Sequence, residues 1–142
     1  MTQEEKDLLL RDLSARLPYG VKGIITFNGN KDIFTLIGNY NTNLYLSDNE
    51  ACHVEDFAPY LRPLSSMTDE ERHEIQEILG KDVEIPDDFI NIIDSSRKSF
   101  SFIELQAVFD YFNAHYLDYR GLIEKGLALP VPEGMYNEIK EK

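Results

Sequence analysis

The sequence contains no tryptophan and only one cysteine, Cys52. One thiol cannot close an internal disulfide, and with three scattered histidines it cannot complete a zinc site of Cys and His ligands. A lone cysteine is typical of a reducing compartment, so we expect a cytoplasmic protein. The first five residues are polar and acidic, whereas a secretory signal needs a basic start and an apolar run.

Long apolar runs are also missing. No stretch approaches the ~18 consecutive apolar residues that a membrane-spanning helix needs. The chain has neither a glycine-rich phosphate loop nor a Gly-x-Ser-x-Gly turn, so the sequence predicts no cofactor and no hydrolase of that type. Disorder is disfavoured because 42% of the residues are hydrophobic and 28% are charged, values that are close to those of average globular proteins.

Basic residues are scarce, with 14 Lys and Arg against 26 Asp and Glu, for a net charge of −12. Residues 48–94 hold 14 acids and 3 bases, so nearly all of this charge belongs to one segment. The negative electrostatic potential of this segment repels phosphate backbones and anionic membranes, so we expect no direct nucleic-acid or membrane partner. The segment is either a well-solvated surface or a face for a basic protein partner.

The first half of the chain predicts one helix followed by a β-meander. Thr2 and Glu5 have the spacing of a capping box, leucines recur at helical intervals, and Pro18 ends the helix. Residues 21–55 alternate apolar and polar side chains between Asn- and Gly-rich turns, which indicates short antiparallel strands.

A proline-containing segment follows the meander. Pro59 and Pro63 flank residues 60–62, and we expect this segment to be neither a central strand nor a helix interior, because proline lacks an N–H donor. A second helix is predicted from Thr68, with acidic residues in its first turn and Glu71 completing a capping box.

The third predicted helix begins after a Ser101 cap and carries an aromatic stripe, which we expect to form the centre of the core. The stripe consists of Phe102, Leu105, Phe109, Phe112 and Tyr116. Residues 118–136 are rich in Gly and Pro and predict a turn-rich strap, whereas residues 83–99 give no clear pattern.

The expected fold class is α+β. In this prediction a small antiparallel meander packs against two or three helices, with the first and third helices covering the sheet and the acidic second helix outside. Residues 1–136 are predicted to form a single domain, and the polar residues 137–142 a frayed tail.

Five residues are candidates for a binding surface, because tyrosine and arginine are favoured anchors in interfaces. They are Tyr60, Arg62, Asp118, Tyr119 and Arg120. The simpler interpretation of the last three is that Asp118 pairs locally with Arg120 while Tyr119 packs into the core.

The histidines and carboxylates offer weaker candidates. His115 ends the third helix, where a cation stabilises the negative end of the helix dipole. Glu70 and Glu74, and likewise Asp69 and His73, lie four residues apart on the second helix, a spacing that could hold a metal. Acidic helix starts are also common for dipole reasons alone, so no metal ligand is assigned.

Three stretches together resemble a family of small uncharacterised proteins of gut Bacteroides-type bacteria, often found in phage-like or mobile regions. They are residues 15–22 (ARLPYGVK), residues 59–68 (PYLRPLSSMT), and the NAH and DYRGLI motifs within residues 113–123. In that family a second histidine often stands where this chain has Tyr116, and this difference argues against a two-histidine site. The resemblance implies a bacterial or phage cytosolic protein and no particular activity.

The leading functional hypothesis is a non-enzymatic binding or accessory protein, monomeric or homodimeric, whose residues 48–94 face a basic protein partner. The alternative is a small metal-assisted hydrolase that uses the acidic second helix.

Overall fold

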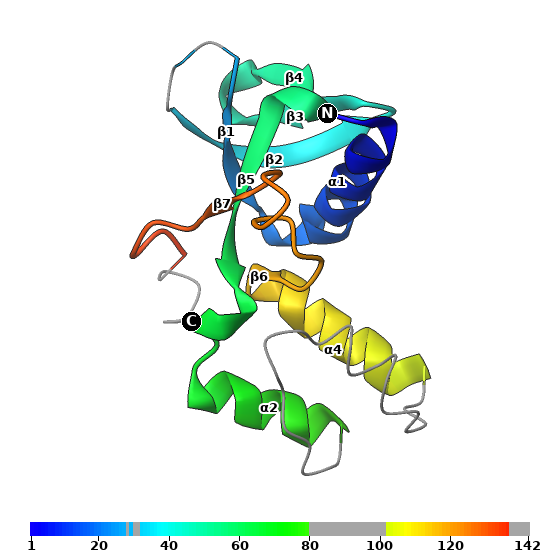
Figure 1. The fold of residues 1–142 in the computed structure, drawn as a ribbon, viewed down its shortest axis with the longest axis vertical. Helices are drawn as coiled ribbons and strands as arrows, with labels where there is room; N and C mark the ends of the chain where they lie inside the picture. The colour runs from blue at the N-terminus through cyan, green and yellow to red at the C-terminus, as the bar shows by residue number, and fades with distance from the viewer. Residues whose placement is uncertain (28, 30–31, 80–101, 137–142) are drawn as a thin grey trace.

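The computed structural model describes residues 1–27, 29, 32–79 and 102–136 (Figure 1). The helices are α1 (Gln3–Arg16), α2 (Asp69–Leu79) and α4 (Phe102–Ala114), with single 3₁₀ turns η1 (Leu17–Tyr19), η2 (Ser47–Asn49), η3 (Val54–Asp56) and η4 (Leu64–Ser66). The strands are β1 (Lys22–Ile25), β2 (Ile33–Tyr40), β3 (Asn43–Leu46), β4 (Ala51–His53), β5 (Phe57–Pro63), β6 (Leu117–Asp118) and β7 (Leu129–Pro130). The α+β class is confirmed.

The sheet has the strand order β4-β3-β2-β1-β5-β6, and β7 pairs with β5 outside this order. Strands β1 to β4 form the predicted antiparallel meander, and β5 lies antiparallel to β1. The short β6 and β7 run parallel to β5. Sequence patterns did not indicate these two pairings, because each involves two residues and depends on a contact more than 50 residues away.

The prediction for the proline segment was wrong, because β5 is a central strand that crosses the middle of the molecule (Figure 1). Each proline lies at the end of a pairing region. Pro59 is the last residue paired with β1, and Pro63 is the last residue paired with β6. The backbone ladder therefore changes partner along β5, with Tyr60 and Leu61 beside β7.

One glycine allows the close approach of β1 to β5. A Cβ atom on Gly23 would lie 2.5 Å from the carbonyl oxygen of Ala58 and 2.5 Å from the ring of Phe57. Real Cβ atoms do not approach other heavy atoms so closely, so any side chain at this position would push the two strands apart.

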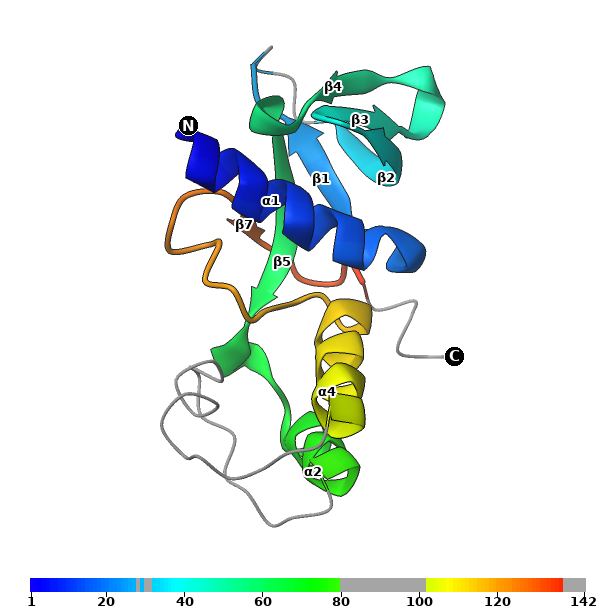
Figure 2. The same cartoon turned by 90° about the vertical axis from the view of Figure 1, so that its right-hand side faces the viewer.

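The first hydrophobic core lies between α1 and the inner face of the sheet (Figure 2). Leu9 and Leu13 of α1 are fully buried there against Leu36, Leu44 and neighbouring strand residues. The strap contributes Leu122 and Leu127 to the same core. The predicted capping box of α1 is present, with Glu5 N–H donating to Thr2 Oγ1 and Thr2 N–H donating to Glu5 Oε1.

The second core corrects the predicted place of the third helix. Instead of covering the sheet, α4 packs mainly on α2, and the two helices lie beyond the end of the sheet (Figures 1 and 2). Val108 and Phe112 are fully buried with Ile75 of α2, whereas Phe109 is only half-buried. Tyr116 lies after the helix, has a φ of +60°, and turns into the first core.

Several predictions fall outside the described residues, namely the Ser101 cap, residues 83–99 and the tail 137–142. The capping box of Thr68 and Glu71 at α2 is present. None of the helices in the described part of the chain combines the length and the apolar character needed to cross a bilayer.

Candidate functional site

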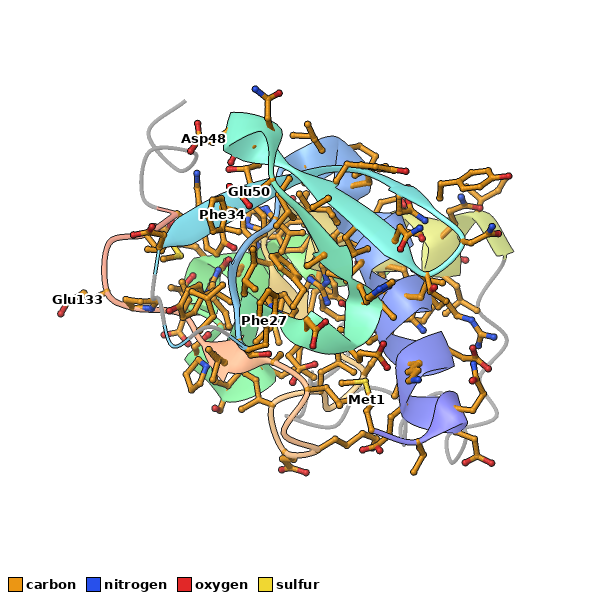
Figure 3. All side chains as sticks on the ribbon, turned by 90° about the horizontal axis from the view of Figure 1, so that it is seen from above. Met1, Phe27, Phe34, Asp48, Glu50 and Glu133 are labelled. Carbon is orange, nitrogen blue, oxygen red and sulfur yellow. The ribbon has the colours of Figure 1, made fainter. Side chains whose placement is uncertain are left out.

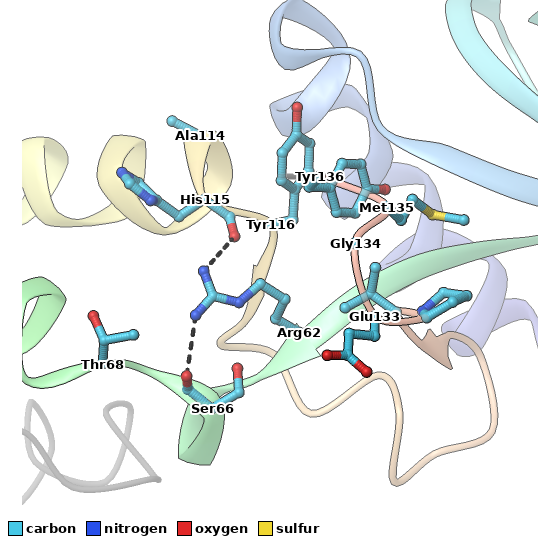
Figure 4. A pocket seen from close by; sticks show the side chains of 12 residues that line it. Arg62, Ser66, Thr68, Ala114, His115, Tyr116, Glu133, Gly134, Met135 and Tyr136 are labelled. Carbon is cyan, nitrogen blue, oxygen red and sulfur yellow. Dashed lines mark hydrogen bonds between the residues drawn. The ribbon is translucent and has the colours of Figure 1, made fainter. Parts of the chain in front are cut away.

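A cavity of about 400 Å³ opens where the two cores meet (Figure 4). Arg62 of β5, with Ser66 and Thr68 that follow it, forms one side, and the end of α4 forms another. Residues 131–136 of the strap close the third side. The cavity thus brings together parts of two of the three stretches that carry the family resemblance, residues 59–68 and 113–123, although these are far apart along the chain.

Arg62 is held in place by four hydrogen bonds. Its Nη1 and Nη2 donate to Oε2 and Oε1 of Glu71 at 2.8 and 2.7 Å, which is the bidentate geometry of a strong ion pair. Its remaining bonds go to the carbonyl oxygens of His115 at 3.4 Å and Ser66 at 3.1 Å (Figure 4). The Arg62 guanidinium therefore links β5 by hydrogen bonds to α2 and to the end of α4.

Glu71 receives a further contact from His115, whose Nδ1 lies 3.2 Å from Oε2. Burial alone would raise the pKa of the Glu71 carboxyl, but hydrogen bonds from Arg62, His115 and the Thr68 backbone more than offset burial. The pKa of this carboxyl is held well below its usual range, so Glu71 is charged at neutral pH. The His115 ring also stacks on Tyr111 at 4.0 Å between centroids.

Two stacked tyrosines form the apolar wall of the cavity. The rings of Tyr116 and Tyr136 lie 3.7 Å apart and 8° from parallel. Tyr116 OH donates to the carbonyl oxygen of Tyr19, while Tyr136 OH accepts from Lys22 N–H at 2.9 Å and donates to the Tyr60 carbonyl at 3.0 Å. Burial raises the pKa of both phenols, so each remains a neutral hydrogen-bonding group.

The cavity therefore combines an aromatic and aliphatic wall with a polar side that carries a net negative charge. The positive charge of Arg62 is neutralised by Glu71, and the exposed Glu133 of the strap adds a negative charge to the lining. This arrangement suits a long side chain with an apolar stem and a polar or cationic end. Both tyrosine hydroxyls already bond backbone groups, so neither of them is free to act as a nucleophile.

The five predicted binding residues are separated by the fold. Tyr60 and Arg62 lie on β5, and only Arg62 lines the cavity described above. The predicted local pair of Asp118 and Arg120 was wrong. Asp118 accepts the backbone N–H groups of Leu122 and Ile123 at 2.8 and 2.9 Å, which fixes the turn at the start of the strap.

Arg120 belongs to a second polar cluster beneath α1. Its Nε donates to Asp12 Oδ1 at 3.1 Å, and Asp12 also pairs with the fully buried Arg16 at 2.8 Å. Tyr119 packs as predicted, with both guanidiniums near its ring, Arg16 at 5.3 Å and Arg120 at 5.0 Å from the centroid. Its hydroxyl donates to Asn113 Oδ1 at 3.0 Å. This cluster joins α1 to the end of α4.

Sequence reasoning missed three residues of the cavity region. Glu71 was recognised only as a cap, His115 only as a dipole partner, and Tyr136 only as part of the strap. Each has a valid local explanation, and the second role appears only when distant segments meet. Of the three, only His115 lies within a stretch of the family resemblance.

The histidine, carboxylate and cysteine candidates of the described residues do not come together in a site. His73 is exposed and pairs with Glu77 at 3.1 Å. Within the described residues, no three His, Cys, Asp or Glu side chains gather closely enough to hold a metal ion. Cys52 faces the first core, and burial, followed by the charge of Asp56, raises the pKa of its thiol to about 11.

No protein-family model, no curated protein and no solved structure matches this chain. The resemblance to Bacteroides-type proteins stays a prediction.

Proposed function

We propose that this chain is a non-enzymatic binding protein that engages a basic protein partner through the exposed face of α2. The observation that carries the proposal is the set of carboxylates on this face. Asp69, Glu70, Glu74 and Glu77 are all exposed. Asp69 and Glu70 lie in the first turn of α2, where both side chains are exposed to a partner.

The support for α2 rather than the whole of residues 48–94 comes from the fold. The acids that precede β5 and those of α2 lie at opposite ends of the molecule (Figure 1). At the former end, Glu55 is engaged by Lys6 at 2.6 Å. A single partner domain can therefore contact only one of the two acidic ends. Of the two, α2 has the larger group of exposed carboxylates, and they lie on one helix.

Rigidity of α2 favours binding, because a fixed charge pattern costs less entropy when a partner docks. The helix is held on its inner side by buried Ile75 and by the Glu71–Arg62 pair. The cavity begins at Thr68, immediately before α2, and its aromatic wall suits the aliphatic stem of a Lys or Arg side chain. The proposal places the protein in the cytoplasm, where Cys52 stays reduced.

The test uses a fluorescent oligolysine peptide titrated at low and at physiological ionic strength. The Glu70→Lys/Glu77→Lys variant should weaken binding by at least tenfold, whereas the matched Glu4→Lys/Glu50→Lys variant should have a much smaller effect. Both variants change the net charge equally, and Glu4 occupies the first turn of α1 as Glu70 does in α2. Equal losses in both variants would mean that only net charge matters, and would overturn the proposal.

The alternative is a metal-assisted hydrolase whose metal ligands lie on α2. Thermal melting with divalent cations distinguishes it from the binding proposal. A metal at a hundred times its dissociation constant stabilises the folded state by about 2.7 kcal/mol, which is several degrees for a chain of this size. A shift that disappears in Glu70→Lys/Glu77→Lys would favour the alternative. An unchanged melting temperature with Mg²⁺, Mn²⁺ and Zn²⁺ would leave the binding proposal as the better account of α2.

A further inference from the structure

The outer face of the meander, opposite α1, carries an apolar surface that the described fold leaves uncovered. Four of its side chains define what we call the sheet patch: Ile33, Ile37, Tyr40 and Tyr45. Their exposed fractions are 49%, 63%, 68% and 45%. Large apolar side chains grouped on one face mark interaction surfaces more often than the same residues scattered singly.

Strand register explains why these residues share a face. Leu36 pairs with Leu46 on the inner face, and the register then shifts so that Gly38 pairs with Tyr45. Ile37 is the additional residue of this bulge, and a bulge places two successive residues on the same side of the strand. Asn39 follows on the inner face, where its side chain reaches Ser14 of α1 at 3.4 Å, so Tyr40 points outward.

Gly38 brings Tyr45 into the patch. Tyr45 stands opposite Gly38, and a Cβ on that glycine would lie 3.9 Å from Tyr45 Cδ2. The tyrosine ring therefore lies over backbone that no side chain covers. On the side away from β2, Tyr45 lines a cavity shared with the exposed Phe27 and, at its rim, with Asp56 of the η3 turn. The patch thus extends across β2 and β3 toward the end of β1.

The charge of this face differs from that of the whole protein. Outward positions of β1 to β4 are occupied by uncharged residues together with Lys22 and His53, and they include no carboxylate. The chain has 26 carboxylates in total. The nearby carboxylates belong to turns: Asp48 lies in η2, Glu50 follows it (Figure 3), and Asp56 lies in η3.

We infer that the sheet patch is the contact surface of a symmetric homodimer. Two molecules of charge −12 repel each other over most of their surface, so they can meet closely only through a face free of carboxylates. An acidic partner would meet the same repulsion, and a basic partner is drawn toward the acidic ends of the molecule. An apolar and tyrosine-rich surface is complementary to itself, as a two-fold contact requires.

The area available indicates a dimer of moderate strength. The two tyrosines together offer on the order of 200 Å² of exposed surface, while a standard interface covers about 800 Å² on each partner. The contact must therefore use the whole outer face of the meander. We expect a dissociation constant in the micromolar range, which sets the concentrations for the experiment.

The test is sedimentation velocity of the full chain from about 1 to 300 µM, at low salt and in 0.5 M NaCl. The wild type should shift from monomer to dimer across this range, and salt should preserve or strengthen the dimer by screening the repulsion between the two copies. Salt should instead weaken binding through α2, so this inference and the proposed function can fail separately.

Single-residue variants locate the contact. Ile37→Lys and Tyr40→Lys should each weaken dimerisation by at least tenfold, while Ile103→Lys should not. Ile103 is a matched control because it is a 79%-exposed isoleucine on α4 that acquires the same charge. Circular dichroism and melting would verify that each variant folds. A wild type that stays monomeric at 300 µM, or face variants that dimerise like the wild type, would overturn the inference.

Discussion

Arg62 and Glu71 form a bidentate ion pair, at 2.7 and 2.8 Å, that joins the central strand β5 to the first turn of α2. Both side chains are less than one-tenth exposed. The same guanidinium also reaches carbonyls of Ser66 and His115, so one side chain connects the sheet with both helices of the second core. The two cores are coupled through this pair.

Removing one partner of the pair should destabilise the protein strongly. Glu71→Gln leaves the charge of Arg62 buried without compensation, which costs about 3–5 kcal/mol for buried pairs. Urea denaturation would measure the change in the free energy of unfolding. Glu70→Gln, one residue earlier and exposed, is the matched control and should leave stability unchanged. If both variants had the same stability as the wild type, the pair would have no coupling role.

The pair also predicts how stability depends on pH. The pKa of Glu71 is lowered in the folded state, so the unfolded state binds more protons in acid. The stabilisation by this group is complete above the unfolded pKa of about 4.3 and is lost as the pH falls below it, by about 1.4 kcal/mol per pH unit. Denaturation curves between pH 5 and pH 2.5 should therefore show a smaller acid loss in Glu71→Gln than in the wild type. Equal pH slopes would contradict this assignment.

The centre of the second core should be Phe112 rather than Phe109. Phe112→Ala removes a fully buried ring and should cost about 3–5 kcal/mol, whereas Phe109→Ala should cost clearly less because that ring is half-buried. Parallel urea titrations of the two variants would measure the difference. A greater loss for Phe109 would contradict the burial seen for α4.

The hydroxyl of Tyr136 should contribute to stability beyond the packing of its ring. Tyr136→Phe keeps the stack on Tyr116 but leaves the Lys22 N–H and the Tyr60 carbonyl without this partner, a loss of about 1–3 kcal/mol. Tyr40→Phe provides a control, because that ring is 68% exposed. Thermal melting at low protein concentration would compare the two. Similar melting temperatures would show that the strap is not fixed by this hydroxyl.

Cys52 should react slowly with thiol reagents in the folded protein. With a pKa of about 11, raised by burial and by Asp56, about 0.1% of the thiol is ionised at pH 8. Reaction with Ellman's reagent at pH 8 should be at least tenfold slower than after denaturation. Asp56→Asn should accelerate the folded-state reaction. A folded protein that reacts at the denatured rate would contradict the burial of the thiol.

Local sequence signals determined most elements of this fold. The capping boxes at Thr2 and Thr68, the helix stop near Pro18 and the alternation through the meander each act over a few residues, so they can be interpreted without tertiary information. The lone cysteine and the charge distribution also follow from the sequence alone. These features fixed the α+β class and the acidic character of α2.

Tertiary structure alone decided where those elements lie and what their polar residues do. No local sequence pattern indicates that Pro59 ends one pairing region of a central strand, or that Arg62 contacts Glu71 and His115. The parallel pairing of β6 and β7 and the placement of α4 on α2 likewise depend on contacts between distant segments. Such contacts are selected by the total apolar area buried and by the satisfaction of buried polar groups, and both are properties of the whole fold.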